Sequence, residues 1–209
     1  MVVSDGELAG LAAIGGFGGL PGVVLASATP EGAAAGLEGL RAKGVVDERG
    51  CLTRFGVVPV RAVEEYCRAG RHVVVNQLRV SVNGDGALTV LHPAPGGWGL
   101  FRLAPAVLMV VLLRAYPFLR AGGEGPAGEW ARLGLAEWAS GHPADGGSLA
   151  VRVVPVGGDG PGVSVFDVRD GGGFEYDLAG GRGRRVPVPV IRARVAALLG
   201  FSGLGAGDV

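Results

Sequence analysis

The chain has 209 residues, of which 48% are hydrophobic and 18% charged, a composition typical of a packed globular protein and not of a disordered chain. The charges of its 19 basic and 19 acidic residues cancel, so no net charge attracts the chain to nucleic acid or to an anionic membrane. Two cysteines exclude a disulfide framework and a zinc knuckle, and the N-terminus lacks the pattern of a secretory signal, so a cytoplasmic protein is predicted.

Residues 1–70 are predicted to be mostly helical. Ser4 and Glu7 form a capping-box pattern that predicts a helix over Asp5–Ile14. Thr29-Pro30-Glu31 predicts the start of a second helix, which Gly44 ends. The segment VVDERGCLT is expected to form two short strands around an Arg49-Gly50 turn, and Pro59 is expected to open a third helix that stops at Gly70.

A glycine-rich run, IGGFGGLPG, separates the first two predicted helices. It fails as a phosphate-binding loop because no lysine follows it, no serine or threonine stands at the magnesium-binding position and no strand precedes it. It also fails as a dinucleotide fingerprint, since it follows a helix and ends in proline. The run is therefore interpreted as a tight chain reversal between helices.

Residues 71–120 are predicted to form three strands and a helix. HVVVNQLRVSV is interpreted as one strand, Asn83–Gly86 as a hairpin turn, ALTVLH and GWGLFRL as two more strands, and Pro105–Tyr116 as a buried helix. A glycine-rich connector, residues 121–148, follows. It carries Trp130 and Trp138 on one stripe of a predicted amphipathic helix, either as cover for the edge of the core or as a partner-binding stripe.

Residues 149–201 repeat this order, with LAVRVVPV, GVSVFDVRD and GFEYDLAG as strands and a final helix after them. The prediction is a single α+β domain over residues 1–209, with a mainly antiparallel sheet and a quasi-twofold βββα repeat. The alternative is that two such meanders arise by chance in an α+β protein. The repeat is one of architecture, because residue-by-residue similarity is slight.

No catalytic, metal or cofactor site is predicted. The three histidines stand in no metal-ligand spacing, and the GxSxG motif of serine hydrolases is absent. Cys67 lies on an apolar helix stripe and is interpreted as a packing residue. Glu175 and Asp177 share a strand face, so a carboxylate pair is conceivable, although a solvated sheet face is the favoured interpretation.

The second helix with the following GVVDERGCLT resembles the recognition helix and wing of winged-helix repressors. Its exposed positions, however, are glycine, alanine and glutamate, whereas base readout uses arginine, asparagine or glutamine. A winged-helix DNA-binding regulator is kept as an alternative, as is an enzyme with an unrecognised site.

Three segments together resemble the EspG-like family, the cytosolic chaperones of the type VII (ESX) secretion system of actinobacteria. The first runs from GLPGVVLA through the second helix to LRAKGVVDERGCLT, and the second is the central strand pair with the long apolar helix. The third is SVFDVRDGGGFEYDL followed by RRVPVPVIRARVAALLGF. The chain departs from the family in being short and in lacking the arginine of the Asp-x-x-Gly-Arg turn at Asp167–Gly171.

The resemblance implies an EspG-like fold and a non-catalytic role: binding a helical PE/PPE-like or WxG-type secretion substrate and keeping it soluble for export. A chaperone surface of this kind needs aromatic anchors and a polar rim. The expected partner-binding residues are Asn83, Asp85, Trp130, Trp138, Phe174 and Tyr176. Phe174 and Tyr176 are equally open to interpretation as the core face of their strand.

Overall fold

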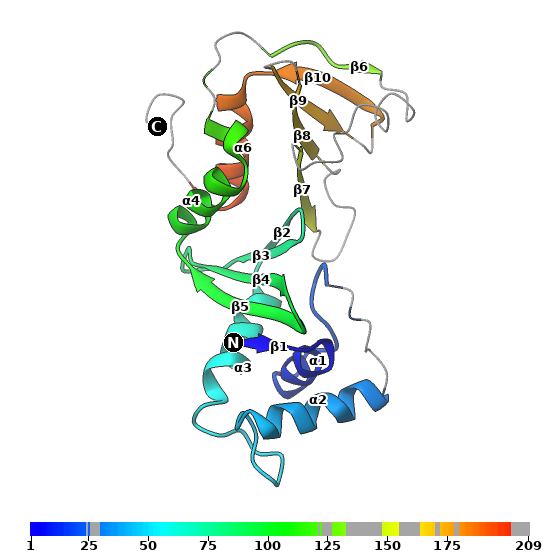
Figure 1. The fold of residues 1–209 in the computed structure, drawn as a ribbon, viewed down its shortest axis with the longest axis vertical. Helices are drawn as coiled ribbons and strands as arrows, with labels where there is room; N and C mark the ends of the chain where they lie inside the picture. Colours follow the sequence, from blue (N-terminus) through cyan, green and yellow to red (C-terminus); the bar gives the residue numbers. More distant parts are fainter. Residues whose placement is uncertain are drawn as a thin grey trace. The chain divides into compact units, whose positions relative to one another are not determined.

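The structure is a computed structural model of the whole chain, and it describes residues 1–23, 25, 30–120, 122, 127–132, 148–154, 164–169, 172–177 and 180–201. It is a mixed α and β fold in which the strand registers are antiparallel (Figure 1). The chain divides into two compact units. The first consists of Met1–His72 and Gln77–Leu103, and the second of Val73–Asn76 and Ala104–Val209. They are called unit 1 and unit 2 below.

Unit 1 combines three helices with a small antiparallel sheet. Its strands run in the order β1-β5-β4-β3. The helices are α1 (Asp5–Ile14), α2 (Pro30–Ala42) and α3 (Val57–Arg68), and the strands are β1 (Val2–Val3), β3 (Leu78–Val82), β4 (Leu88–Ala94) and β5 (Gly97–Leu103). Helix α3 contacts β3, β4 and β5, helix α1 contacts α3 and β5, and α2 packs on α1. Helix α1 therefore lies between the sheet and α2, and α3 packs on the sheet beside α1.

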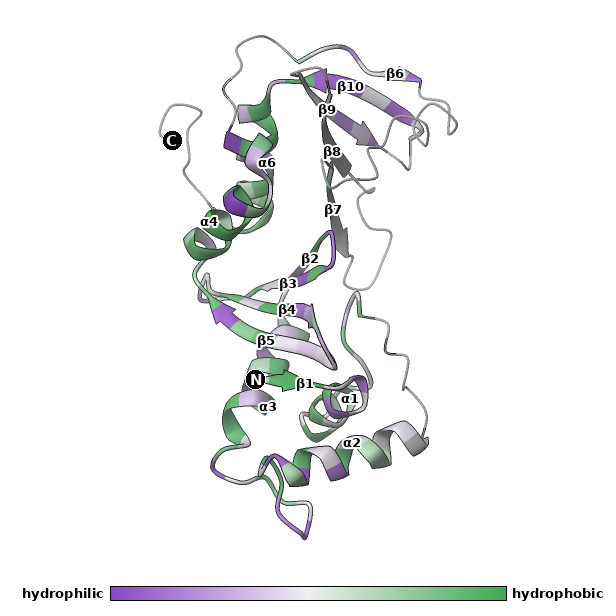
Figure 2. Cartoon of the chain, viewed as in Figure 1, coloured by the Kyte–Doolittle hydropathy of each residue, from purple (hydrophilic) through white to green (hydrophobic). Residues whose placement is uncertain are grey.

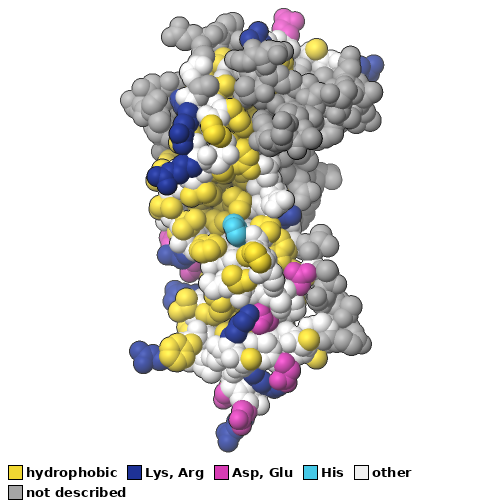
Figure 3. All heavy atoms as spheres, in the orientation of Figure 1, with side chains coloured by type: hydrophobic (Ala, Val, Ile, Leu, Met, Phe, Trp, Pro, Cys, Tyr) yellow, Lys and Arg dark blue, Asp and Glu magenta, His cyan; other side chains and the backbone are white. Residues whose placement is uncertain are grey.

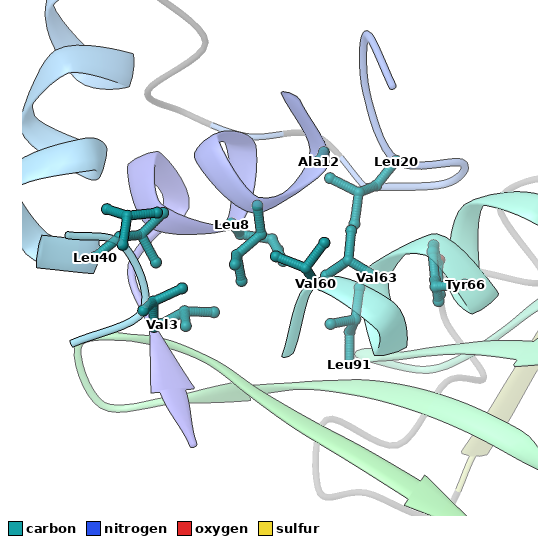
Figure 4. Packing of buried hydrophobic residues seen from close by; sticks show 12 residues of the cluster. Val3, Leu8, Ala12, Leu20, Leu40, Val60, Val63, Tyr66 and Leu91 are labelled. Atoms are coloured by element: carbon teal, nitrogen blue, oxygen red, sulfur yellow. The ribbon is translucent and has the colours of Figure 1, made fainter. Parts of the chain in front are cut away.

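The core of unit 1 forms where α1, α3 and the sheet meet. Figure 4 shows side chains from β1, α1, α2, α3 and β4 packed together. The members of this cluster are Val3, Leu8, Leu11, Ala12, Leu20, Leu40, Val45, Val46, Val60, Val63, Tyr66 and Leu91. Because Leu40 and Leu20 also belong to it, the end of α2 and the glycine-rich run are both anchored to the same core.

Helices α1 and α2 cross at glycines. A Cβ atom placed on Gly36 would lie 2.1 Å from the carbonyl oxygen of Gly6, and one on Gly6 would lie 2.5 Å from that of Gly32. No larger residue fits at such a distance, so the glycines permit a close backbone approach that any side chain would prevent. Next to the crossing, Glu7 is buried, and its carboxylate accepts hydrogen bonds from the Ser4 backbone N–H at 2.7 Å and the Lys43 ammonium at 2.5 Å.

Unit 2 contains a second set of strands, covered by helices. Its strand order is β2-β7-β8-β9-β10-β6. The bounds are β2 (Arg71–Val75, whose first two residues belong to unit 1), β6 (Ala131–Arg132), β7 (Ser148–Val154), β8 (Ser164–Arg169), β9 (Gly172–Asp177), β10 (Arg182–Val186), α4 (Pro105–Ala115), the 3-10 helix η1 (Pro117–Arg120) and α6 (Val188–Leu198). Helix α6 contacts β9, and η1 contacts both α4 and α6.

Several local predictions are confirmed. Helix α1 occupies the predicted range, with both hydrogen bonds of the Ser4/Glu7 capping box present. Helix α2 begins at Pro30, and the turn at Asn83–Gly86 joins β3 to β4. The α+β class and the antiparallel pairing are also as predicted.

The predicted number of strands in each half is wrong, because within the described residues each half has four and not three. HVVVNQLRVSV is two strands, β2 and β3, separated at Asn76, which adopts the left-handed conformation at φ 50° and so turns the chain. In the C-terminal half the additional strand is β10, with the sequence RGRRV. The arginines of β10 do not form the alternating apolar pattern of a strand, and the structure explains them by the carboxylates of β9, with which β10 pairs.

Three other boundaries differ from the prediction. The segment around Arg49-Gly50 forms one isolated bridge, Val46 to Leu52, in place of two strands. Helix α3 begins at Val57, two residues before Pro59. Trp130 precedes the short strand β6, so the helix predicted from Trp130 to Trp138 is wrong at its start, and Trp138 lies outside the described residues.

The crossing of α1 and α2 generates a test. Gly36→Ala should lower the free energy of unfolding by about 2 kcal/mol, the usual cost of overpacking, although alanine in an exposed helix would normally gain about 1 kcal/mol over glycine. Gly18→Ala is the matched control, because a Cβ there meets nothing within 4 Å. Urea denaturation followed by circular dichroism measures both. Equal stability of the two variants would show that the crossing tolerates a side chain.

Candidate functional site

The glycine-rich run between α1 and α2 serves as a set of backbone acceptors. The Tyr66 hydroxyl donates to the carbonyl oxygen of Pro21 at 2.7 Å, and Arg79 Nε donates to that of Gly22 at 2.7 Å. The turn begins at Gly16, which has a positive φ of 82°. Carbonyl oxygens repel a phosphate, so the run is a structural turn attached to α3 and β3, as the sequence suggested.

Asn83 and Asp85, two of the predicted partner-binding residues, stabilise their own hairpin. Asn83 is buried; its amide donates to Thr89 Oγ1 at 3.0 Å and its Oδ1 accepts from Ser81 Oγ at 3.0 Å. Asp85 accepts from the Ala87 backbone N–H at 3.0 Å, and this hydrogen bond, together with Arg102, holds the pKa of the Asp85 carboxyl below its usual range. Both side chains therefore have structural partners in place.

The aromatic residues Phe174 and Tyr176 lie on one face of β9, as predicted. Their rings stack with centroids 6.4 Å apart, Tyr176 is buried, and Phe174 is half-buried. Trp130 is half-buried at a different place, where the Arg182 and Arg184 guanidinium groups lie 4.9 and 4.5 Å from its ring centre. Tyr176 is therefore buried on the face of β9 opposite Glu175, which pairs with Arg194 of α6, and Trp130 lies against the arginines of β10.

The two carboxylates of β9 that the sequence suggested as a pair, those of Glu175 and Asp177, both form ion pairs with arginines. Asp177 pairs with Arg182 at 3.0 Å, and Glu175 pairs with Arg184 at 2.8 Å and with Arg194 of α6. The favoured interpretation of a solvated face is wrong for Glu175, which is buried. Both carboxylates of the pair are therefore bound by arginines of β10 and α6.

His72 is the buried histidine of unit 1. Its Nε2 lies 2.7 Å from the Tyr66 carbonyl oxygen, its Nδ1 has no hydrogen-bond partner among the described residues, and its ring lies edge-on to that of Tyr66. Burial lowers the pKa of the imidazole below 6.5. No group of three or more potential metal-ligating side chains occurs in the described part of the chain. Among the helices described, none is long and apolar enough to cross a membrane.

The first exposed apolar surface, the α4 face, consists of Val107, Val110 and Val111. These side chains are 48, 50 and 47% exposed, while Leu108, Met109 and Leu112 on the other side of the same helix are buried. The prediction of a buried helix is therefore wrong for half of its circumference. Figure 2 shows α4 as one of the most hydrophobic elements, and Figure 3 shows hydrophobic side chains gathered over it.

The second exposed apolar surface, the Phe55 groove, lies in unit 1 between the start of α3 and β5. Phe55 and Val58 are 82 and 74% exposed, and the groove encloses 640 Å³. It is lined by Met1, Phe55, Val57, Val58, Pro59, Arg61, Ala62, Glu65, Leu100, Phe101 and Arg102. Exposed apolar surface of this kind in a folded domain marks interaction sites.

None of the residues that form the α4 face or line the Phe55 groove was among the predicted partner-binding residues. For α4 the sequence PAVLMVVLLRA is apolar on all sides, which predicts a buried helix, and only the packing shows which valines are left uncovered. For the groove, the run Phe55-Gly56-Val57-Val58 places apolar residues at a helix start, where no amphipathic period requires them.

No protein-family model matches the chain, and no curated protein matches it.

The histidine predicts a pH-dependent stability. Because the folded protein disfavours protonated His72, the unfolded state binds more protons as pH falls below 6.5, and the free energy of unfolding should decrease there. Urea midpoints at pH 7.5 and pH 5.5 measure the loss, which His72→Gln should reduce. An identical pH response in wild type and His72→Gln would contradict the assignment.

The two cysteines should differ in reactivity. Burial raises the pKa of Cys67 to about 11, so at pH 8 roughly one Cys67 in a thousand is thiolate. Cys51 is exposed. A disulfide reagent should therefore label one thiol quickly in the native protein, and Cys51→Ser should abolish that fast phase. Fast labelling that survives Cys51→Ser would make Cys67 a reactive thiol and reopen a nucleophilic role.

Proposed function

We propose that this chain is a non-catalytic, EspG-like secretion chaperone that binds the apolar part of a helical PE/PPE-type or WxG-type substrate of a type VII (ESX) secretion system. The observation that carries the proposal is the α4 face, three half-exposed valines on a helix that is apolar all round. A helix of this kind normally has both sides covered. A substrate helix laid against the α4 face supplies the missing cover.

The order of elements supports the same family. A helical N-terminal region is followed twice by four strands and a helix, β2 to β5 with α4 and β7 to β10 with α6. This order is compatible with the quasi-twofold repeat of an EspG-like fold, with four strands in each half where the sequence suggested three.

The charges beside the α4 face favour an acidic partner. Arg114 lies one turn beyond Val110 and Val111 and is exposed, and no carboxylate occurs in α4, η1 or α6. Arginine beside an apolar stripe pairs well with a carboxylate on a docked helix, and it selects against basic partners. The substrate helix is therefore expected to carry an acidic residue at the edge of its apolar tip.

The DNA-binding alternative needs basic residues that are free to contact DNA, but those at the end of α2 already make contacts within the protein. Arg41 pairs with Glu38 at 2.5 Å, and Lys43 pairs with Glu7 at 2.5 Å and also donates to the Val2 carbonyl oxygen at 3.0 Å. One face of α2 is occupied by the crossing with α1. What remains exposed on α2 offers few donors for base edges.

Co-expression with helical proteins encoded by neighbouring genes, followed by affinity capture and size exclusion, tests the proposal. We expect a stable complex with the wild type, and a loss of affinity of about tenfold or more for Val110→Lys, because the variant places a charge in the centre of the interface. Val58→Lys, in the Phe55 groove, is the matched control and should retain the complex.

Two results would overturn the proposal. One is a chain that captures no helical partner but retards a DNA probe at physiological salt, which would favour the regulator. The other is a complex whose affinity is unchanged by Val110→Lys, which would remove the α4 face from the function.

A further inference from the structure

Strand β5 has an outer edge that β1 covers only in part. The register pairs Val2 with Gly99 and Val3 with Trp98, and the Leu100 N–H donates to the Met1 carbonyl oxygen at 3.2 Å. Beyond Leu100, β5 continues for three residues to Leu103. Within the described residues, no strand pairs with this part of β5 on the β1 side.

The free part of the edge presents main-chain hydrogen-bonding groups. Because the Leu100 N–H is directed at β1, and because successive residues of an antiparallel strand alternate in direction, the N–H and C=O of Arg102 are directed to the same side. On the other side, β5 pairs with β4 throughout. An uncovered edge of this kind is a template for another strand.

The Phe55 groove lies along this same edge. Leu100 and Phe101, which point to opposite faces of the sheet, both line it together with Met1 and Arg102. The groove therefore follows the rim of the strand and is not confined to one face. Across from β5 it is bounded by Phe55, Val57 and Val58, all exposed and apolar.

The charges at the groove are already satisfied by one another. Glu65 lies 3.0 Å from Arg102 and 3.6 Å from Arg61, and Arg102 also pairs with Asp85. Two arginines and two carboxylates leave no net charge to select an acidic or a basic ligand. Selection at this place then depends on apolar side chains and on the main chain.

We propose that the Phe55 groove binds an extended peptide segment of a partner protein, with apolar side chains at alternate positions, as a strand added to β5. The segment lies antiparallel to β5 and continues the line of β1, with its main chain paired to Arg102 and its apolar side chains against Phe55 and Val58 on the α3 side of the sheet. This is β-augmentation, in which main-chain pairing supplies affinity and alternate side chains supply specificity. A helix cannot satisfy Arg102, because its own main-chain groups are already paired.

This site is independent of the proposed chaperone function. It lies in unit 1, on β5 and α3, whereas the α4 face belongs to unit 2. Val110→Lys should therefore leave binding at the Phe55 groove unchanged, and Val58→Lys should abolish it, so failure of one proposal does not imply failure of the other.

The probe is a fluorescent peptide of alternating valine and threonine with a lysine at each end, titrated against the full chain in fluorescence anisotropy. Two matched isomers carry N-methyl groups either on all valine amides or on all threonine amides. Each isomer loses the donors on one edge of the strand. Added-strand binding should be weakened about tenfold or more in one isomer and preserved in the other, because only one edge faces β5.

A pair of variants tests the β5 side. Arg102→Ala removes the side chain and keeps the N–H, whereas Arg102→Pro removes both, at an edge position that proline tolerates. We expect the probe to bind the alanine variant and to bind the proline variant about tenfold more weakly. In the wild type, saturation with the probe should slow hydrogen exchange of the Arg102 amide.

Four outcomes would overturn the inference. The first three are equal weakening by both N-methyl isomers, equal binding to the alanine and proline variants with no protection of the Arg102 amide, and no binding to the wild type at about 1 mM probe, the weak limit of a specific site. Unchanged binding in Val58→Lys would likewise exclude the Phe55 groove.

Discussion

The close crossing of α1 and α2 at Gly6 and Gly36 is the constraint on which unit 1 depends. It brings the α2 backbone against α1, and this approach buries Leu40 and encloses Glu7. The buried carboxylate then needs two donors, which the Ser4 N–H and Lys43 supply. At the start of α1, Asp5 accepts a hydrogen bond from the Trp98 indole at 2.8 Å, so the helix is also tied to β5. One pair of glycines thus determines where the helices stand relative to the sheet of this unit.

The parts of the fold that could be predicted are those whose cause is local in the chain. The Ser4/Glu7 capping box and the Pro30 start of α2 require only neighbouring residues, and both were predicted to the residue. The turn at Asn76 was not predicted because a glutamine follows this asparagine, whereas the usual hairpin pattern is asparagine followed by glycine. Strand β10 was missed because its arginines are explained only by the carboxylates across the sheet, on β9.

The candidate sites depended more strongly on tertiary structure. Aromatic residues of a strand and of a predicted helix indicated a partner surface, yet Tyr176 is buried and Trp130 lies against arginines. Conversely, whether the valines of α4 are covered depends on what packs against the helix, and no pattern within eleven residues determines that. The uncovered edge of β5 could not be predicted from the sequence, because it depends on the strand register and on β1 being two residues long.

The short strand β1 also has a practical consequence for handling the protein. The Met1 carbonyl oxygen accepts from Leu100, so the chain direction at Met1 leads straight along β5 toward Arg102. A purification tag fused in front of Met1 begins within a few ångströms of the Phe55 groove, at an effective concentration in the millimolar range. Such a tag would act as an intramolecular competitor, and its sequence would alter the apparent affinity of any strand offered from outside.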